Sequence, residues 1–281
     1  MGTPQRKLLP MKPTGMPLDP PALFAACVTL LEEELPWGEL GKLYCHEGGE
    51  DFFAPAQVDA MREAALKITA DLAAALEEME APAEGTTAPG ASLYVGAAVA
   101  ELVPALCECL ILGRQVRLVN LPGPEVTLIN AALGRVEKQL EKEGAWGTTA
   151  RLPRLAIDTH AVDKLRFDHL WIASVLTDPQ AFPALHDELY DLLPRKGKEP
   201  VEDEKTPTGK GNLHAERKQA RDLLRKFVSR VDAPGVLTTS DEEIELLRIA
   251  FEERGLTLKA QRPARLSAIV GDPIRSYRIN N

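Results

Sequence analysis

The stretch ASLYVGAAVAELVPAL, residues 91–106, decides the fold of this chain. Residues that favour a strand run into Gly96, then into a string of small residues, and finally into a helix-forming segment. A strand that turns at a glycine into a helix is the layout of loops that cradle a phosphate or a nucleotide. It is also the layout of a tightly packed corner between a strand and a helix. These residues leave both interpretations open.

Short apolar runs alternate with amphipathic segments from residue 92 to the end of the chain. Strands are predicted at 92–96, 115–122, 154–160, 167–176 and 235–240, with closing strands in LTLKAQ and in RLSAIV or SYRI. Helices are predicted between them, at 100–113, 124–144, 179–194, 213–231 and 241–255. Because strands alternate with helices, we expect a largely parallel sheet covered by helices on both faces.

The first 90 residues have a different pattern. Helical spacing of apolar residues occurs at 20–35 and at 54–81, and Pro, Gly and Thr accumulate at 81–91. The sequence therefore predicts two parts: an N-terminal helical extension with its linker, 1–90, and an α/β domain, 91–281.

Composition excludes several classes of function. A net charge of -9 argues against a broad nucleic-acid surface, which needs clustered Lys and Arg. No run approaches the roughly 18 apolar residues of a membrane span, and the N-terminus lacks the apolar core of a signal peptide. We therefore expect a cytoplasmic protein without a membrane partner. No metal is expected either, because the ligand-type residues of YCHEGGEDFF, 44–53, are adjacent on an irregular loop.

The order of these elements resembles the class I S-adenosylmethionine (SAM)-dependent methyltransferases. The similar phrases are SLYVGAAVAEL for the first strand and glycine loop, VRLVNLP for the second strand, RLAIDTHAV for the third, FDHLWIASVL for the fourth and VDAPGVLTTSDEE for the fifth. The resemblance covers roughly residues 90–281. It implies a Rossmann-like methyltransferase fold: a mostly parallel seven-stranded sheet that ends in an antiparallel hairpin, with helices on both faces.

The resemblance also implies where SAM would bind. The loop after the first strand would hold the cofactor with Tyr94, Gly96, Ala97, Ala98 and Ala100. Family members carry roughly G-x-G-x-G here, so that the backbone can pass close to the methionine part of SAM. In this chain only the first glycine is present. The alternative remains a corner that packs a helix on a strand.

Two further strand ends would contact the nucleoside. The family usually has an acidic residue after the second strand, which binds the ribose hydroxyls. In this chain Asn120 and Leu121 occupy that position. Glu125 could supply the carboxylate instead, or it could lie in solvent at the helix N-terminus. After the third strand, Asp158 would receive the adenine amino group, with Thr159 and His160 beside it. The alternative for Asp158 is a cap of the following turn.

After the fourth strand, Ala173 and Ser174, followed by Val175 and Leu176, would line the floor where methyl donor and acceptor meet. The Asn/Asp-Pro-Pro-aromatic signature of amino-methylating members is absent, and no catalytic residue can be named. The charged segment RKGKEPVEDEKTPTGKG, 195–211, is either a lid or a surface excursion.

Three functions are compatible with these residues. The first is a SAM-dependent methyltransferase with a small-molecule substrate. Such an enzyme could also act as a homo-oligomer. The second is a non-catalytic relative that serves as an interaction or regulatory protein. The third uses SAM or another nucleoside for different transfer chemistry, as aminopropyl-transferring relatives do. Binding of SAM separates the second function from the other two.

Overall fold

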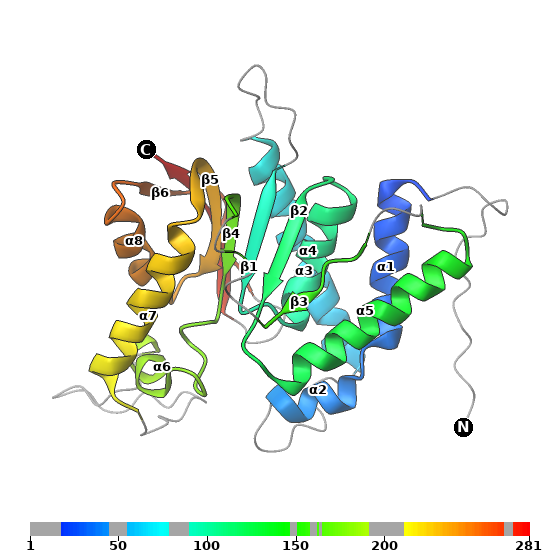
Figure 1. Cartoon of the computed structure of the whole chain (residues 1–281), viewed down its shortest axis with the longest axis horizontal. Helices are drawn as coiled ribbons and strands as arrows, with labels where there is room; N and C mark the ends of the chain where they lie inside the picture. The colour runs from blue at the N-terminus through cyan, green and yellow to red at the C-terminus, as the bar shows by residue number, and fades with distance from the viewer. Residues whose placement is uncertain are drawn as a thin grey trace.

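The structure is a computed structural model that describes residues 18–44, 55–78, 90–146, 151–157, 162, 165–190, 211–266 and 272–281. Its centre is one sheet with the strand order β3-β2-β1-β4-β5-β8-β6, and β7 pairs with β8 beside this path (Figure 1). The strands are β1 (Ala91–Val95), β2 (Gln115–Val119), β3 (Leu155–Ala156), β4 (Phe167–Ile172), β5 (Val231–Ser240), β6 (Thr257–Ala260), β7 (Arg265–Leu266) and β8 (Pro273–Asn280).

Strands β1 to β5 run parallel to one another, and β8 is antiparallel to β5, β6 and β7. The last strand in the sequence therefore lies between β5 and β6, and with β6 it forms an antiparallel pair. This arrangement confirms the expected fold: a mostly parallel Rossmann-like sheet of seven strands that ends in an antiparallel hairpin. The short strand β7 adds an eighth member to the sheet.

Helices cover both faces of the sheet. They are α1 (Pro20–Glu34), α2 (Trp37–Tyr44), α3 (Pro55–Glu77), α4 (Val99–Leu110), α5 (Pro124–Lys142), α6 (Pro183–Leu189), α7 (Leu213–Val228) and α8 (Ile244–Glu252). One hydrophobic cluster joins α4 and α5 to one face, and a second joins α6, α7 and α8 to the other. Among the described helices, none is both long and apolar enough to cross a membrane.

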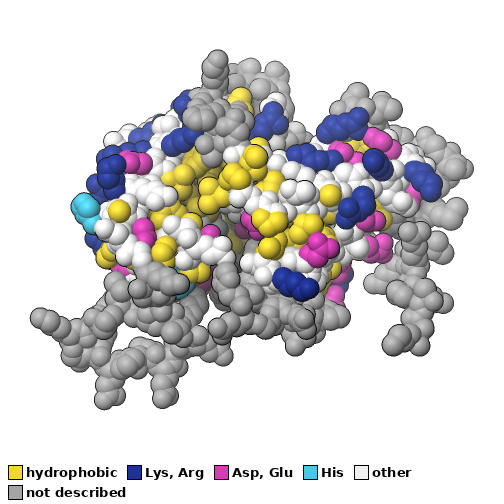
Figure 2. All heavy atoms as spheres, turned by 60° about the horizontal axis from the view of Figure 1, so that its bottom comes forward, with side chains coloured by type: hydrophobic (Ala, Val, Ile, Leu, Met, Phe, Trp, Pro, Cys, Tyr) yellow, Lys and Arg dark blue, Asp and Glu magenta, His cyan; other side chains and the backbone are white. Residues whose placement is uncertain are grey.

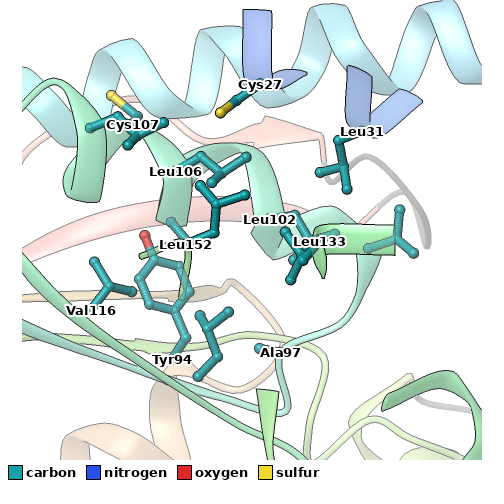
Figure 3. Packing of buried hydrophobic residues seen from close by; sticks show 14 of the residues in the cluster. Cys27, Leu31, Tyr94, Ala97, Leu102, Leu106, Cys107, Val116, Leu133 and Leu152 are labelled. Atoms are coloured by element: carbon teal, nitrogen blue, oxygen red, sulfur yellow. The ribbon is translucent and has the colours of Figure 1, made fainter. Parts of the chain in front are cut away.

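The N-terminal helices belong to the core on the α4 face. Helix α3 packs beside α4 and reaches β5 and β8, while α1 lies against α4 and α5. Cys27 of α1 is fully buried in the same cluster as Leu106 of α4 (Figure 3). Leu72 of α3 is fully buried in this cluster too. The described helices α1 and α3 therefore supply part of the cover of the sheet. The predicted boundary at residue 90 itself stays a prediction.

A buried polar network lies between α4 and the sheet. Glu108 of α4 is fully buried, and its carboxylate accepts hydrogen bonds from Tyr94 Oη at 2.5 Å, Arg114 Nε at 2.9 Å, His169 Nδ1 at 2.9 Å and the hydroxyl of Ser92. Because a carboxylate can only accept, the Nδ1 of His169 carries the hydrogen in this contact. Arg114 is also buried and forms an ion pair with Asp168 at the start of β4.

The predicted element bounds differ from the structure at many element ends, and three of these differences have a clear local cause. Helix α2 was not predicted, because its eight residues follow a proline and contain two glycines. Strand β5 begins at Val231 rather than at 235, with Pro234 inside it after a cis peptide bond. Described residues of the third strand form a ladder only at Leu155–Ala156, shorter than the predicted 154–160. Each of these three differences lies where a glycine, a proline or an edge position weakens the local pattern.

Candidate site at the carboxyl edge of the sheet

The carboxyl ends of the parallel strands meet at the lower side of the view in Figure 1. Strand β1 has β2 on one side and β4 on the other, so the connections of the chain diverge between β1 and β4. Open α/β sheets bind ligands at such a topological switch point, outside the carboxyl ends of the strands. Figure 2 brings this side forward and shows hydrophobic side chains gathered across its middle.

Gly96 forms the corner between β1 and α4. Its φ is +70°, in the left-handed region, and a Cβ built on it would come within 2.4 Å of Val175 Cγ2. A side chain is therefore excluded at Gly96 by the left-handed backbone conformation and by the side chain of Val175, which lies in the loop after β4. The packed-corner interpretation accounts for this glycine without a ligand.

The side chains of Tyr94 and Ala97 are part of the core. Both residues are fully buried, and Figure 3 shows them within the hydrophobic cluster at α4. The Tyr94 hydroxyl donates to Glu108, and the Ala97 backbone N–H donates to Val119 O at 3.1 Å. Both side chains face the helix-covered interior of the sheet, so that only the backbone of these two residues is left to contact a cofactor, and their place in the cofactor site stays a prediction.

Ala98 and Ala100 remain half-buried at the corner. Ala98 is the N-cap of α4 and has extended backbone angles, φ -133° and ψ -152°. Any residue adopts this region, so the missing second glycine imposes no strain on the loop. The two methyl groups replace glycine hydrogens at little steric cost.

Glu101 closes the first turn of α4. Its Oε2 accepts the backbone N–H of Ala98 at 2.8 Å, which satisfies one of the free donors at the helix N-terminus. Burial raises the pKa of Glu101 to about 7, although the hydrogen bond from Ala98 opposes this rise. The negative charge of nearby Glu125 adds to the rise. The corner thus holds a carboxyl group that has lost most of its contact with water.

Asn120 lies at the end of β2, where its amide is bound within the protein. Its Nδ2 donates to Ala97 O at 2.7 Å and to Glu125 Oε1 at 2.8 Å, while its Oδ1 accepts the N–H of Leu121 at 2.7 Å. Both amide hydrogens are used in these contacts. Asn120 therefore ties the glycine corner to the first turn of α5 and orients the carboxylate of Glu125.

Two apolar side chains are exposed at the same edge. Leu121 after β2 is 62% exposed, and Ile157 after β3 is 54% exposed. Since Leu118 and Val119 pair with Leu155 and Ala156, these two strand ends are neighbours. The predicted adenine-binding residues Asp158, Thr159 and His160 lie outside the described residues, as does most of the segment 195–211.

The loop after β4 completes the edge. Ala173 is buried in the core, whereas Ser174 is half-buried and has φ +57°. The Ser174 hydroxyl donates to Asp272 Oδ2 at 3.3 Å. Of the two residues predicted at this position, only Ser174 keeps part of its side chain at the surface.

A hydrophobic groove adjoins the corner on the N-terminal side. It encloses about 50 Å³ and is lined mainly by α1, α3 and the first turns of α4, including Leu31, Met61 and Val99. This volume holds no more than about two water molecules. Among the described residues, no group of three or more His, Cys, Asp or Glu side chains is placed to hold a metal ion.

Comparison with known proteins adds only distant similarities. The sequence matches no family model and no curated protein. One similar solved structure is magnesium protoporphyrin IX methyltransferase (ChlM) from Synechocystis PCC 6803 with bound SAM, with a TM-score of 0.45 and 11% identity over 91% of this chain and 97% of that chain. A second is precorrin-6y C5,15-methyltransferase from Geobacter metallireducens GS-15, with a TM-score of 0.36 and 10% identity over 70% of this chain and 83% of that chain. A third is MtNAS in complex with MTA and tNA, with a TM-score of 0.39 and 14% identity over 91% of this chain and 69% of that chain. All three TM-scores are below 0.5, so the fold rests on the strand order of this chain.

Several residues of the edge were not predicted as site residues. Glu101 had a local signal, because a Glu three residues after a helix N-cap is typical of a capping box. Ile157 had none beyond its place at a strand end. Glu243 and Asp272 could not be found locally, because the loop residues that they contact are 67 and 98 positions away in the sequence.

Proposed function

We propose that this chain is a SAM-dependent methyltransferase that binds SAM at the carboxyl edge of β1, β2 and β4 and methylates a small-molecule acceptor. The observation that carries the proposal is the switch point between β1 and β4 in a sheet whose last strand, β8, is antiparallel and lies between β5 and β6. A sheet of this order is what the resemblance implied, and its switch point is where such a fold binds a nucleoside.

The nucleoside end of SAM fits the residues after β2 and β3. Glu125 already accepts from Asn120 with Oε1, which leaves Oε2 for the ribose hydroxyls. The exposed side chains of Leu121 and Ile157 offer apolar surface for the adenine ring. The role of Asp158 in receiving the adenine amino group remains a prediction.

The methionine end fits the corner at α4. Ala98 and Ala100 are small and half-buried, so the backbone of the first helical turn stays accessible. Glu101 and Glu125 place two carboxyl groups close to one another there. The Glu125 carboxylate attracts the positive charges of SAM, and Glu101 adds to this attraction only where the pH exceeds its raised pKa of about 7.

The chemistry depends mainly on alignment. The sulfonium of SAM supplies the activated methyl group, and the protein contributes by holding an acceptor in line with it. The loop after β4, with Ser174 and Val175, lies beside the glycine corner and so borders this position. No general base is required for an acceptor that is already a good nucleophile.

Calorimetry with SAM and with S-adenosylhomocysteine tests the proposal. We expect both to bind, and a ligand at 100 times its dissociation constant should add about 2.7 kcal/mol to the apparent stability in a thermal-shift assay. Absence of binding at millimolar ligand would contradict the proposal and favour a non-catalytic interaction protein. Binding without methyl transfer to any acceptor would favour other transfer chemistry.

A pair of variants on α5 tests the ribose contact. Glu125→Gln should weaken S-adenosylhomocysteine about tenfold, because hydrogen bonds to a charged acceptor are stronger than those to a neutral one. Glu141→Gln is the matched control, since the Glu141 side chain is 49% exposed near the other end of the same helix. Equal affinity of the two variants would remove the ribose assignment of Glu125.

A further inference from the structure

The loop after β4 touches the glycine corner directly. Val175 faces Gly96 so closely that a Cβ on the glycine would lie 2.4 Å from Val175 Cγ2. Strands β1 and β4 are paired up to Val95 and Ile172, so this contact comes at the point where both strands have just ended. The position of Val175 therefore sets how much room remains at the switch point.

A buried carboxyl group from a different part of the sheet holds this loop. Glu243, at the N-cap of α8, is fully buried, and its Oε1 accepts the backbone N–H groups of Leu176 and Thr177, the latter at 3.2 Å. Successive N–H groups that converge on one oxygen form an anion-binding concavity. Burial raises the pKa of Glu243 to about 7, and the carboxylate of Asp272 adds to the rise.

The other end of the loop is held by Asp272, the residue before β8. Ser174 has φ +57°, which non-glycine residues rarely adopt, and its hydroxyl donates to Asp272. Tyr190 at the end of α6 donates its hydroxyl to the same oxygen of Asp272. The loop is thus fixed at both ends by carboxyl groups from the β5–β8 half of the sheet, while Val175 between them reaches the glycine corner.

Glu243 holds the loop through more than the two N–H groups of Leu176 and Thr177. Its carboxyl group also receives a hydrogen bond from the backbone N–H of Val175, which opposes the rise of its pKa. Its second oxygen, Oε2, is buried as well. The visible contribution of this carboxyl group is therefore the position of residues 175–177.

We propose that Glu243 is a positioning residue: by holding the N–H groups of Leu176 and Thr177 it fixes Val175 against Gly96 and thereby sets the geometry of the ligand site. This inference rests on the proposed function, because it concerns the same switch point. It assigns to the β5–α8 junction a role in ligand binding, although Glu243 itself does not contact the ligand.

Three variants test this role. Glu243→Gln keeps an oxygen acceptor for the two N–H groups, Glu243→Ala removes it, and Glu245→Gln is the matched control on the same helix, with a side chain 76% exposed. Hydrogen exchange of the Leu176 and Thr177 amides measures the hold on the loop. Calorimetry with S-adenosylhomocysteine measures the ligand site.

We expect Glu243→Ala to speed exchange of both amides about tenfold and to weaken S-adenosylhomocysteine about tenfold, because a small misplacement of a site wall has large effects. Glu243→Gln should restore both properties to within about twofold of the wild type, and Glu245→Gln should change neither. Faster exchange with unchanged affinity would mean a structural role only and would overturn the inference. If the wild-type protein does not bind S-adenosylhomocysteine, the proposed function fails first, and this inference fails with it.

Discussion

Replacing Glu108 by glutamine perturbs the buried network between α4 and the sheet. The carboxylate is fully buried and neutralises Arg114, whose own side chain is 1% exposed. Burial alone would raise the pKa of Glu108, but His169 and Arg114, together with the hydrogen bond from Ser92, outweigh it and lower the pKa to about 2. Glutamine keeps the shape of the side chain and removes the charge.

The magnitude follows from this pKa. A fall from 4.5 to about 2 corresponds to about 3 kcal/mol, at roughly 1.4 kcal/mol per pKa unit. Removing one partner of a buried ion pair costs about 3–5 kcal/mol in other proteins, which agrees in size. Because the folded-state pKa is depressed, the contribution is present above pH about 4.5 and is lost as the pH falls towards 2.

Urea unfolding followed by tryptophan fluorescence measures the effect. Trp171 stacks on Tyr94 with ring centroids 5.2 Å apart, so its emission reports on the network itself. At pH 7, Glu108→Gln should lose about 3 kcal/mol of the free energy of unfolding, and it should lack the decline of the wild type between pH 5 and pH 2. Glu141→Gln, which breaks an exposed ion pair with Arg151, should lose less than about 1 kcal/mol. A loss below about 1 kcal/mol for Glu108→Gln, or an unchanged pH dependence, would refute the reasoning.

Three further predictions concern the edge of the sheet. Gly96→Ala should destabilise the protein by at least about 2 kcal/mol in urea unfolding, because it forces a left-handed alanine against Val175, and a second change, Val175→Ala, should recover part of the loss. Ala98→Gly should leave the affinity for S-adenosylhomocysteine within about twofold in calorimetry, since Ala98 is already in the extended region; clearly tighter binding would contradict this. Glu101 has a folded-state pKa raised to about 7, so its contribution to stability is present below pH about 4.5 and is lost as the pH rises through 7. Relative to the wild type, Glu101→Gln should therefore gain about 3 kcal/mol in the free energy of unfolding between pH 5 and pH 8, and an equal difference at both pH values would argue against it.

The sequence by itself determined the kinds of element and their order. Alternation of apolar strands with amphipathic helices predicted the parallel sheet with helices on both faces, and Gly96 marked the corner between β1 and α4. These features depend on hydrophobic periodicity and on backbone preferences of single residues, which are local properties. For the same reason the N-terminal helices were predicted from residues 20–35 and 54–81, but the faces that they cover were not.

Only the tertiary structure decided which side chains meet. The sequence predicted that Asn120 or Glu125 contacts ribose, and it could not show that the amide hydrogens of Asn120 bind Ala97 and Glu125. These contacts form because the end of β2 comes to lie between two other segments. Glu108 lies 61 residues from His169, and Glu243 lies 67 residues from Leu176. No local pattern encodes a hydrogen bond or an ion pair across such separations, since the partner is chosen by the packing of the whole sheet.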